Sequence, residues 1–177
     1  METTKWALDP THSEISFKVR HMMIANVSGS FNKFDVHATT EGHDFTKAKI
    51  NFTADAASID TNSEQRDGHL RGADFFDTEK FPHITFESTS LEKKNEEEYK
   101  LNGNLVIKNV AKPVSLNVTF GGIGKDPYGN TKAGFTIEGK INRKDFDLGW
   151  NAPLETGGVL VGEDLKIHAE LQMAKVQ

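Results

Sequence analysis

The chain has 177 residues, a formal net charge of −5 and no cysteine. This length suits one domain, over residues 1–177, with a substantial core. Without cysteine there is no disulfide framework, thiolate nucleophile or zinc–sulfur site. The negative charge, together with the absence of a basic run, disfavours nucleic acid and anionic membrane surfaces as partners. Apolar stretches stay far short of the roughly 18 residues of a membrane span, so we predict a soluble rather than an integral membrane protein.

The first residues enter strand-like sequence directly, without the basic segment and apolar run of a secretory signal. We therefore expect a cytoplasmic protein. Phenylalanine is abundant, with 12 residues against two tryptophans and two tyrosines. Because a phenyl ring has no polar group, many of them on one inner surface favour a dry, apolar interior.

Apolar and polar residues alternate with period two along most of the chain, which is typical of strands with one buried face. In chain order the alternating segments are 14–20, 84–87, 101–107, 114–120, 135–141 and 165–173. A sheet with one apolar face must bury it against a second sheet or close on itself. The pattern predicts an all-β protein, and alternation does not distinguish a sandwich from a barrel.

Two short helical segments are predicted between the strands. The first is a single turn at His21–Ala25. The second is a helix at about Ser63–Arg71, where Asn62 provides a cap, Gln65 completes a capping box and Gly72 ends the helix. The predicted turns lie at Asn95, 108–109, 121–122, 126–130 and 157–158, where Gly, Pro, Asn and Asp gather.

Seven histidines raise the question of a metal site, and none of them has His-x-His or His-x₃-His spacing. His12, His21 and His69 could still meet in space. Zinc sites usually show paired local ligands, so we interpret these residues as rim or surface histidines and predict neither a metal nor a cofactor.

Polar residues concentrate next to Phe75 and Phe76. Arg66, Asp67 and His69 either form a polar end-group site or dock the helix through ion pairs, and we favour docking. Catalysis would need a nucleophile or base oriented by a partner, and no such set can be assembled from the sequence.

Several motifs carry a family resemblance in order along nearly the whole chain. They begin with Trp6-x-x-Asp9-x-x-His12-Ser13 and Ile15-x-Phe17-x-Val19-Arg20-His21, and continue with Val27-x-Gly29-x-Phe31 and Ser58-Ile59-Asp60-Thr61. They go on with Arg66-Asp67-x-His69-Leu70-Arg71, Asp74-Phe75-Phe76-Asp77, Phe81-Pro82-x-Ile84-Thr85-Phe86, Gly103-x-Leu105-x-Ile107, Lys112-Pro113-Val114 and Arg143-x-Asp145-Phe146 before Trp150. With these motifs the chain resembles the YceI-like proteins, a bacterial family of lipocalin-like barrels associated with binding polyisoprenoids and other long-chain lipids. Asn109, Gly72 and Asp147 depart from the family pattern at positions that affect local loop shape and not the fold.

The resemblance implies an antiparallel lipocalin-like β-barrel of about eight strands, with one or two short helices at its rim. It further implies binding, storage or transport of a polyisoprenoid, an isoprenoid quinone or a fatty-acid-like lipid in the interior, and a homodimer. By alternation and likeness, the expected lining residues are Phe17, Val19, Phe31, Phe34, Phe75, Phe76, Phe86, Leu105, Phe135 and Trp150. The expected mouth residues are Arg20, His21, Arg66, Asp67 and His69.

We predict a lipid carrier and not an enzyme. Two rival hypotheses remain. One is an enzyme that acts on a bound lipid or quinone with His69 or His21 as acid–base. The other is a stress-related structural or interaction protein whose interior is packed with its own side chains.

Overall fold

A computed structural model describes residues 2–151 and 160–176 of the chain. Its strands are β1 (Thr3–Leu8), β2 (Glu14–His21), β3 (Ala25–Phe31), β4 (Phe34–Glu41), β5 (Asp44–Asp55), β6 (Ile59–Asp60), β7 (His83–Lys93), β8 (Glu98–Ile107), β9 (Val110–Lys125), β10 (Thr131–Asn142) and β11 (Val161–Lys175). The helices are α1 (Glu64–Arg71) and the 3₁₀ turns η1 (Pro10–His12), η2 (Ala56–Ser58) and η3 (Arg143–Phe146).

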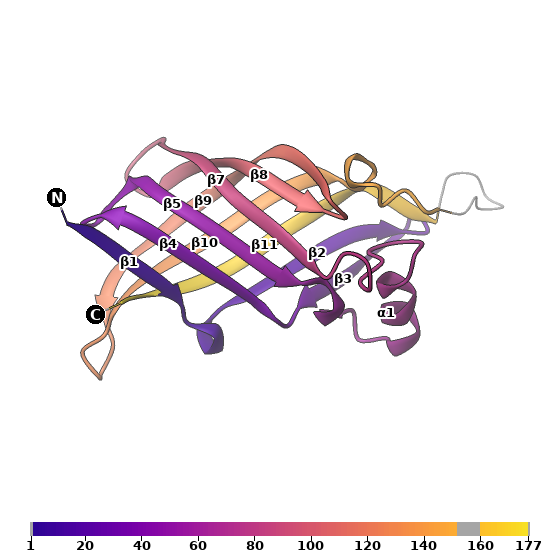
Figure 1. Ribbon diagram of the computed structural model, residues 1–177, viewed down its shortest axis with the longest axis horizontal. Helices are drawn as coiled ribbons and strands as arrows, with labels where there is room; N and C mark the ends of the chain where they lie inside the picture. Colours follow the sequence, from indigo (N-terminus) through magenta and orange to yellow (C-terminus); the bar gives the residue numbers. More distant parts are fainter. Residues whose placement is uncertain (1, 152–159, 177) are drawn as a thin grey trace.

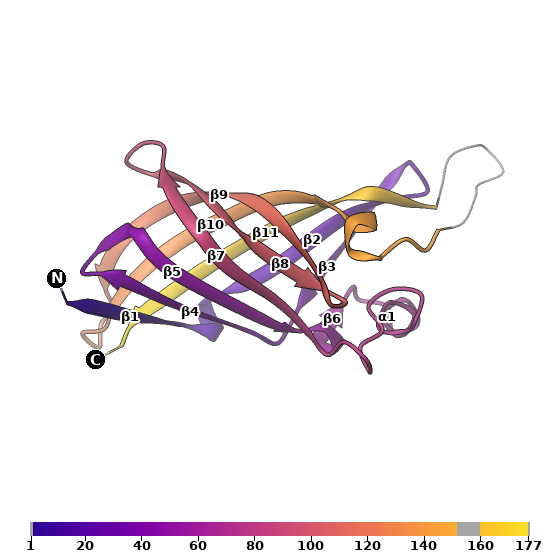
Figure 2. The same ribbon diagram turned by 45° about the horizontal axis from the view of Figure 1, so that its top comes forward.

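The sheet closes on itself (Figures 1 and 2). Eight of the described strands, β1, β4, β5, β7, β8, β9, β10 and β11, follow one another in antiparallel pairs, and β1 pairs with β11. After η1, β2 continues along the remaining length of β11, and β3 runs along β2. The closed antiparallel barrel with a short helix confirms the predicted fold and rules out the sandwich.

The two ends of the barrel differ (Figure 1). Helix α1 lies at one end, which we call the α1 end, and β1 begins and β11 ends at the other, which we call the terminal end. Within the described residues, no helix combines the length and apolarity needed to cross a membrane.

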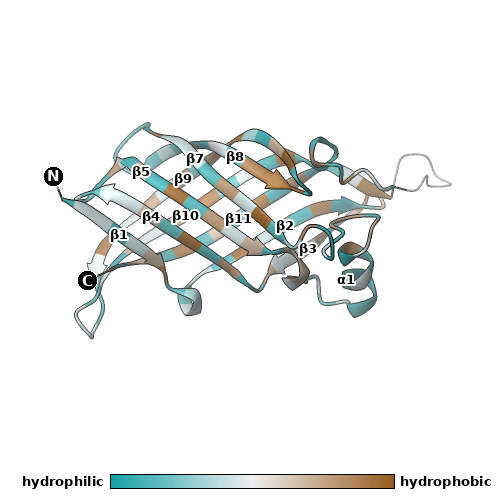
Figure 3. Cartoon of the chain, viewed as in Figure 1, coloured by the Kyte–Doolittle hydropathy of each residue, from teal (hydrophilic) through white to brown (hydrophobic). Residues whose placement is uncertain are grey.

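The predicted alternation places apolar residues inside. On β8, Leu101, Leu105 and Ile107 are buried, and Asn104 between them is exposed. Figure 3 shows the same alternation of apolar and polar residues along the strands. Each strand thus contributes one apolar row to the interior.

Aromatic rings fill the terminal end. Phe45 lies 5.5 Å from Trp6, 5.3 Å from Phe120 and 5.2 Å from Phe135, measured between ring centroids. Trp6 is only 1% exposed, and its indole N–H donates to the hydroxyl of Thr40 at 3.0 Å. The one polar atom of this cluster thus has a partner, and the partly buried rings of Phe120 and Phe135 pack against the buried Trp6 and Phe45.

Helix α1 confirms the predicted rim helix, with Gly72 at its C-cap as expected. The N-cap is Ser63, whose hydroxyl accepts from the amide of Arg66, so the prediction of Asn62 as the cap was wrong. Asn62 has φ +64°, outside the extended region that an N-cap occupies.

The predicted helical turn at His21–Ala25 was also wrong. Met22 and Met23 have φ of 53° and 61°, so this segment is the tight turn of the β2–β3 hairpin.

Most predicted turns are confirmed. Turns join β7 to β8 around Asn95, β8 to β9 at 108–109 and β9 to β10 at 126–130. The turn predicted at Gly121-Gly122 is wrong, because β9 continues through it and skips one residue against β10 as a bulge. The pair at 157–158 lies outside the described residues.

Asp9 gives a testable pH dependence of stability. Its carboxylate lies 2.8 Å from Lys132 Nζ and 2.9 Å from His12 Nδ1, which ties η1 to β10. These two hydrogen bonds, that of Lys132 first, hold the pKa of Asp9 well below its usual range. A carboxyl with a depressed folded-state pKa stabilises the protein above its unfolded pKa of about 3.9, and this contribution disappears as the pH falls through the folded-state pKa.

We therefore expect Asp9→Asn to lower the free energy of unfolding at pH 7 by up to about 1 kcal/mol. The gap from the unaltered protein should narrow as the pH falls below about 4. Urea unfolding between pH 7 and pH 3 measures both values, with Glu96→Gln at an exposed hairpin tip as the control. A gap that is constant with pH would contradict the assignment.

Candidate functional site: an apolar cavity at the α1 end

A cavity of about 600 Å³ occupies the α1 end of the barrel. Its wall comes from β2, β3, β5, β7, β8, β10 and β11, and α1, η3 and the segments beside them surround its mouth. Of the 29 lining residues that the structure describes, twenty-one are apolar, so most of the wall suits hydrocarbon.

The structure brings ten of the fifteen expected site residues to this cavity. They are Phe17, Val19, His21, Phe31, Arg66, His69, Phe75, Phe76, Leu105 and Trp150.

The structure places the other five expected residues elsewhere. Phe34 packs against Phe52 with ring centroids 6.2 Å apart, and Phe135 belongs to the aromatic cluster of the terminal end. Phe86 is buried beyond the cavity and does not line it. Arg20 is exposed and donates to the carbonyl of Met23 at 3.1 Å, and Asp67 is buried beneath α1.

Aromatic rings make one side of the mouth. The His69 ring lies 5.1 Å from Phe75 and 4.8 Å from Trp150, edge to face in both cases, and Phe75 lies 5.4 Å from Trp150. The Nε2 of His69 is 3.0 Å from the Asp74 carboxylate. Three aromatic groups from α1, the segment after it and the segment after η3 thus meet at the entrance.

Hydrogen bonds through Thr61 dock α1 onto the barrel. The buried Asp67 carboxylate accepts from the amide and the hydroxyl of Thr61, at 2.9 and 2.5 Å. Arg66 donates to the same hydroxyl at 2.8 Å and to the Thr61 carbonyl at 2.6 Å. These contacts agree with the docking role that we favoured for Arg66 and Asp67. They are hydrogen bonds to Thr61, however, and not the expected ion pairs. Arg66 also lines the cavity.

A second arginine, Arg143, holds the other side of the mouth and is 3% exposed. Its guanidinium donates to the carbonyls of Gly162 at 2.7 Å, Trp150 at 2.9 Å and Val161 at 3.1 Å, and also to that of Leu148. Burial lowers the pKa of Arg143, and the charge of Glu163 opposes this shift. An arginine remains protonated under such a shift, so the cavity wall carries a cation whose hydrogen-bond partners are neutral.

Sequence reasoning missed several lining residues. Ile84, Ile107 and Ile167 lie on the apolar rows that alternation had identified, and an even treatment of aliphatic and aromatic residues would have included them. Arg143 directly follows β10 at the next inward position after Ile141, so extending the alternation by one step would have included it. Leu148 gave no such signal, because the segment after η3 folds back across the mouth.

The three histidines considered for a metal site have separate surroundings. His12 pairs with Asp9, His69 pairs with Asp74, and His21 lines the cavity. Among residues 2–151 and 160–176, no group of three His, Cys, Asp or Glu side chains is placed to hold a metal ion.

Comparison with known proteins agrees with this geometry. The model of the YceI-like domain matches residues 6–173. The UPF0312 protein SA2479 of Staphylococcus aureus is 37% identical over 172 residues, which cover 97% of this chain and 98% of that protein.

Solved structures share the fold. BcnA of Burkholderia cenocepacia superposes with a TM-score of 0.81 at 24% identity, covering 93% of this chain and 98% of that one. A polyisoprenoid-binding domain from Saccharophagus degradans, implicated in plant cell wall breakdown, has a TM-score of 0.69 at 14% identity and covers 97% and 98%.

Arg143 provides a test of how the mouth is held. Lysine keeps the charge but cannot reach four carbonyls at once, so Arg143→Lys leaves buried acceptors without donors. We expect the free energy of unfolding to fall by about 2–4 kcal/mol.

Urea unfolding measures this loss, and Arg20→Lys is the matched control, since Arg20 is exposed and makes one hydrogen bond to a carbonyl. The control should change stability by no more than about 0.5 kcal/mol. Equal stability of the two variants would show that Arg143 does not hold the mouth.

Proposed function

Because the chain belongs to the YceI-like family, we propose that it binds one long-chain apolar lipid inside the α1 end of its barrel and stores or carries it unchanged. The observation that carries this proposal is the cavity of about 600 Å³ with its predominantly apolar wall. The polyisoprenoid-binding domain with the same fold supports a lipid of this general kind.

Hydrocarbon burial supplies enough free energy for such binding without charge contacts. Each methylene moved from water into an apolar site contributes about 0.8 kcal/mol. A chain of about ten methylenes therefore gains several kcal/mol even after the cost of immobilising it. A bound chain also supplies van der Waals contacts to the wall, whose side chains lack partners on one side when the apolar cavity is empty.

The polar part of the lining favours a polar head at the mouth. Five of the eight polar residues in the described lining come from one segment, Thr61 to His69. Among the described lining residues there are two arginines and no carboxylate. We infer that the lipid head carries acceptor oxygens, as a carboxylate or phosphate does, and lies beside Arg66.

The aromatic contacts of His69 suit a packing role at the mouth. Its ring packs between Phe75 and Trp150, and its Nε2 faces Asp74. We propose that His69 shapes the aromatic side of the mouth, in place of the acid–base role that an enzyme would give it.

The first test asks whether lipid occupies the cavity. Leu165→Trp places an indole in the cavity wall and should abolish retention of apolar lipid. Mass spectrometry of organic extracts and titration with a fluorescent fatty acid measure retention, and the bound lipid should be recovered with unchanged mass.

Lys166→Trp is the control, because this neighbour on β11 is exposed and outside the cavity lining. Circular dichroism checks that both variants fold. If the unaltered protein binds no apolar chain, or if both folded variants bind equally well, the proposed site is wrong.

The second test concerns the head group. Removing the Arg66 guanidinium deletes the one lining cation on α1, so Arg66→Met should weaken binding of a fatty acid about tenfold, from the loss of a charge-assisted hydrogen bond. The alcohol of equal chain length should be affected less.

Arg71→Met is the matched control. Arg71 also docks α1, by donating to the carbonyls of Ala57 and Ile59, yet it does not line the cavity. Equal losses of fatty-acid affinity in the two variants would assign Arg66 to docking alone.

A further inference from the structure

The cavity ends about halfway along the barrel. On β5 and β8 its inner limit is at Phe52 and Leu105, and both are paired in register with Phe86 on β7 between them. Phe86 is 6% exposed and does not line the cavity. The interior is therefore occupied by protein from the level of Phe86 onward.

Next to Phe86, three strands carry small residues at their inward positions. These positions would leave empty space inside the barrel if larger neighbouring side chains did not cover them. The next inward positions on β8, β10 and β11 are Gly103, Gly139 and Ala169. A Cβ added at Gly103 would lie 2.4 Å from Cζ of Phe86, and one added at Gly139 would lie 2.2 Å from Cδ2 of Leu116. The Phe86 ring and the Leu116 side chain thus lie across the two glycines.

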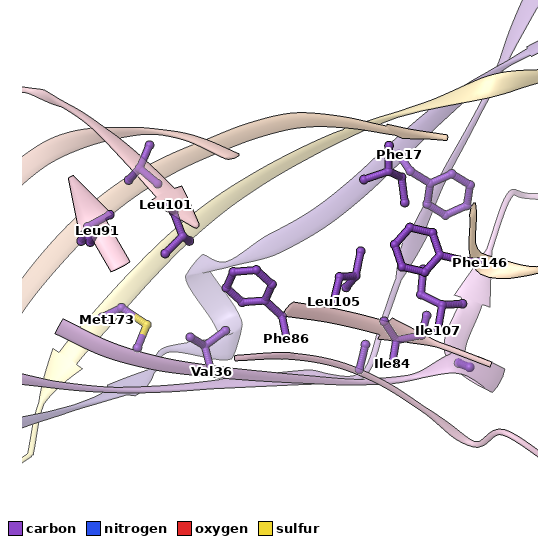
Figure 4. Packing of buried hydrophobic residues seen from close by; sticks show 14 of the residues in the cluster. Phe17, Val36, Ile84, Phe86, Leu91, Leu101, Leu105, Ile107, Phe146 and Met173 are labelled. Atoms are coloured by element: carbon purple, nitrogen blue, oxygen red, sulfur yellow. The ribbon is translucent and has the colours of Figure 1, made fainter. Parts of the chain in front are cut away.

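We call Phe86 and Leu116 the partition. Figure 4 shows Phe86 between two groups of buried residues, with Leu105, Ile84 and Ile107 on its cavity side and Leu101, Val36 and Met173 on its other side. The second group is 3–4% exposed. Beyond it lies the aromatic cluster of the terminal end, so the partition is backed by packed core.

We propose that the partition makes this protein selective for chain length, so that the enclosed part of its ligand is limited to about 20 heavy atoms. This inference rests on the proposed function. The limit follows from the cavity of about 600 Å³, since an atom with its share of condensed-phase volume takes about 30 Å³, as water does. The ligand class is a fatty-acid-like chain or a short isoprenoid. A polyisoprenoid of about 40 carbons would leave roughly half its length outside the cavity. That half stays in water and therefore adds no affinity.

A homologous series of fatty acids tests the limit on the unaltered protein. Competition against a fluorescent fatty acid should show affinity rising about fourfold per methylene until the ligand has about 20 heavy atoms, and no further rise beyond it. A polyisoprenol of about 40 carbons should bind no more tightly than one of about 20 carbons. Affinity that continues to rise through chains of about 26 carbons would overturn the length limit and leave the proposed function standing. Binding of no chain at all would refute the proposed function itself.

Two variants test whether Phe86 sets the limit. Phe86→Ala removes six ring carbons beside the cavity, so the plateau should move to chains longer by up to about six carbons. Phe86→Leu should give a smaller shift in the same direction, and it serves if the alanine variant does not fold.

Phe120→Ala is the matched control, because this ring lies in the aromatic cluster, away from the cavity lining. It should lower the melting temperature and leave the plateau where it is. An unchanged plateau in a folded Phe86 variant, or an equal shift in the control, would overturn the role of the partition.

Discussion

The pairing of β1 with β11 is the constraint on which the rest of the structure depends. Once those strands join, every inward side chain faces one enclosed space, and no open sheet edge remains in the ring. An eight-stranded barrel has an interior just wide enough for side chains to fill it or for one small ligand. The choice between packed core and binding site is therefore made locally, residue by residue, along each strand.

The chain makes that choice through where its aromatic rings lie. Trp6, Phe45, Phe120 and Phe135 meet at the terminal end, and their combined volume closes it. At the α1 end, Phe17 turns its ring across Gly29 of the paired strand, where a Cβ would lie 2.6 Å from Cζ. A ring that lies against a glycine backbone occupies the wall and leaves the axis free. Phe86 lies against Gly103 in a similar way, but with Leu116 and packed core around it the same arrangement closes the interior.

The sequence predicted the barrel better than it predicted the cavity. Alternation identified the inward row of β8, and the family resemblance selected closure of the sheet. Alternation assigns a face and not a depth, which is why Phe34 and Phe135 were expected at the lining beside Phe17 and Phe31. Depth is set by strand register and stagger, and these emerge only when distant strands pair. Leu148 was missed for a related reason, because the segment that carries it folds back after η3 and is held there by hydrogen bonds from Arg143.

Polar anchoring explains how the mouth stays open. A helix held by a broad apolar face would send several apolar side chains into the barrel and fill it, whereas α1 contributes Leu70 as its one apolar lining residue. Helix α1 is instead anchored by the buried Asp67, whose carboxylate accepts hydrogen bonds from Thr61 at the rim. Arg143 does the same for the opposite side by gathering four backbone carbonyls. Such contacts are directional and stop at the wall, whereas apolar packing extends until space is filled. Hydrogen bonds therefore anchor the rim at both sides, and about 600 Å³ of largely apolar space remains between them.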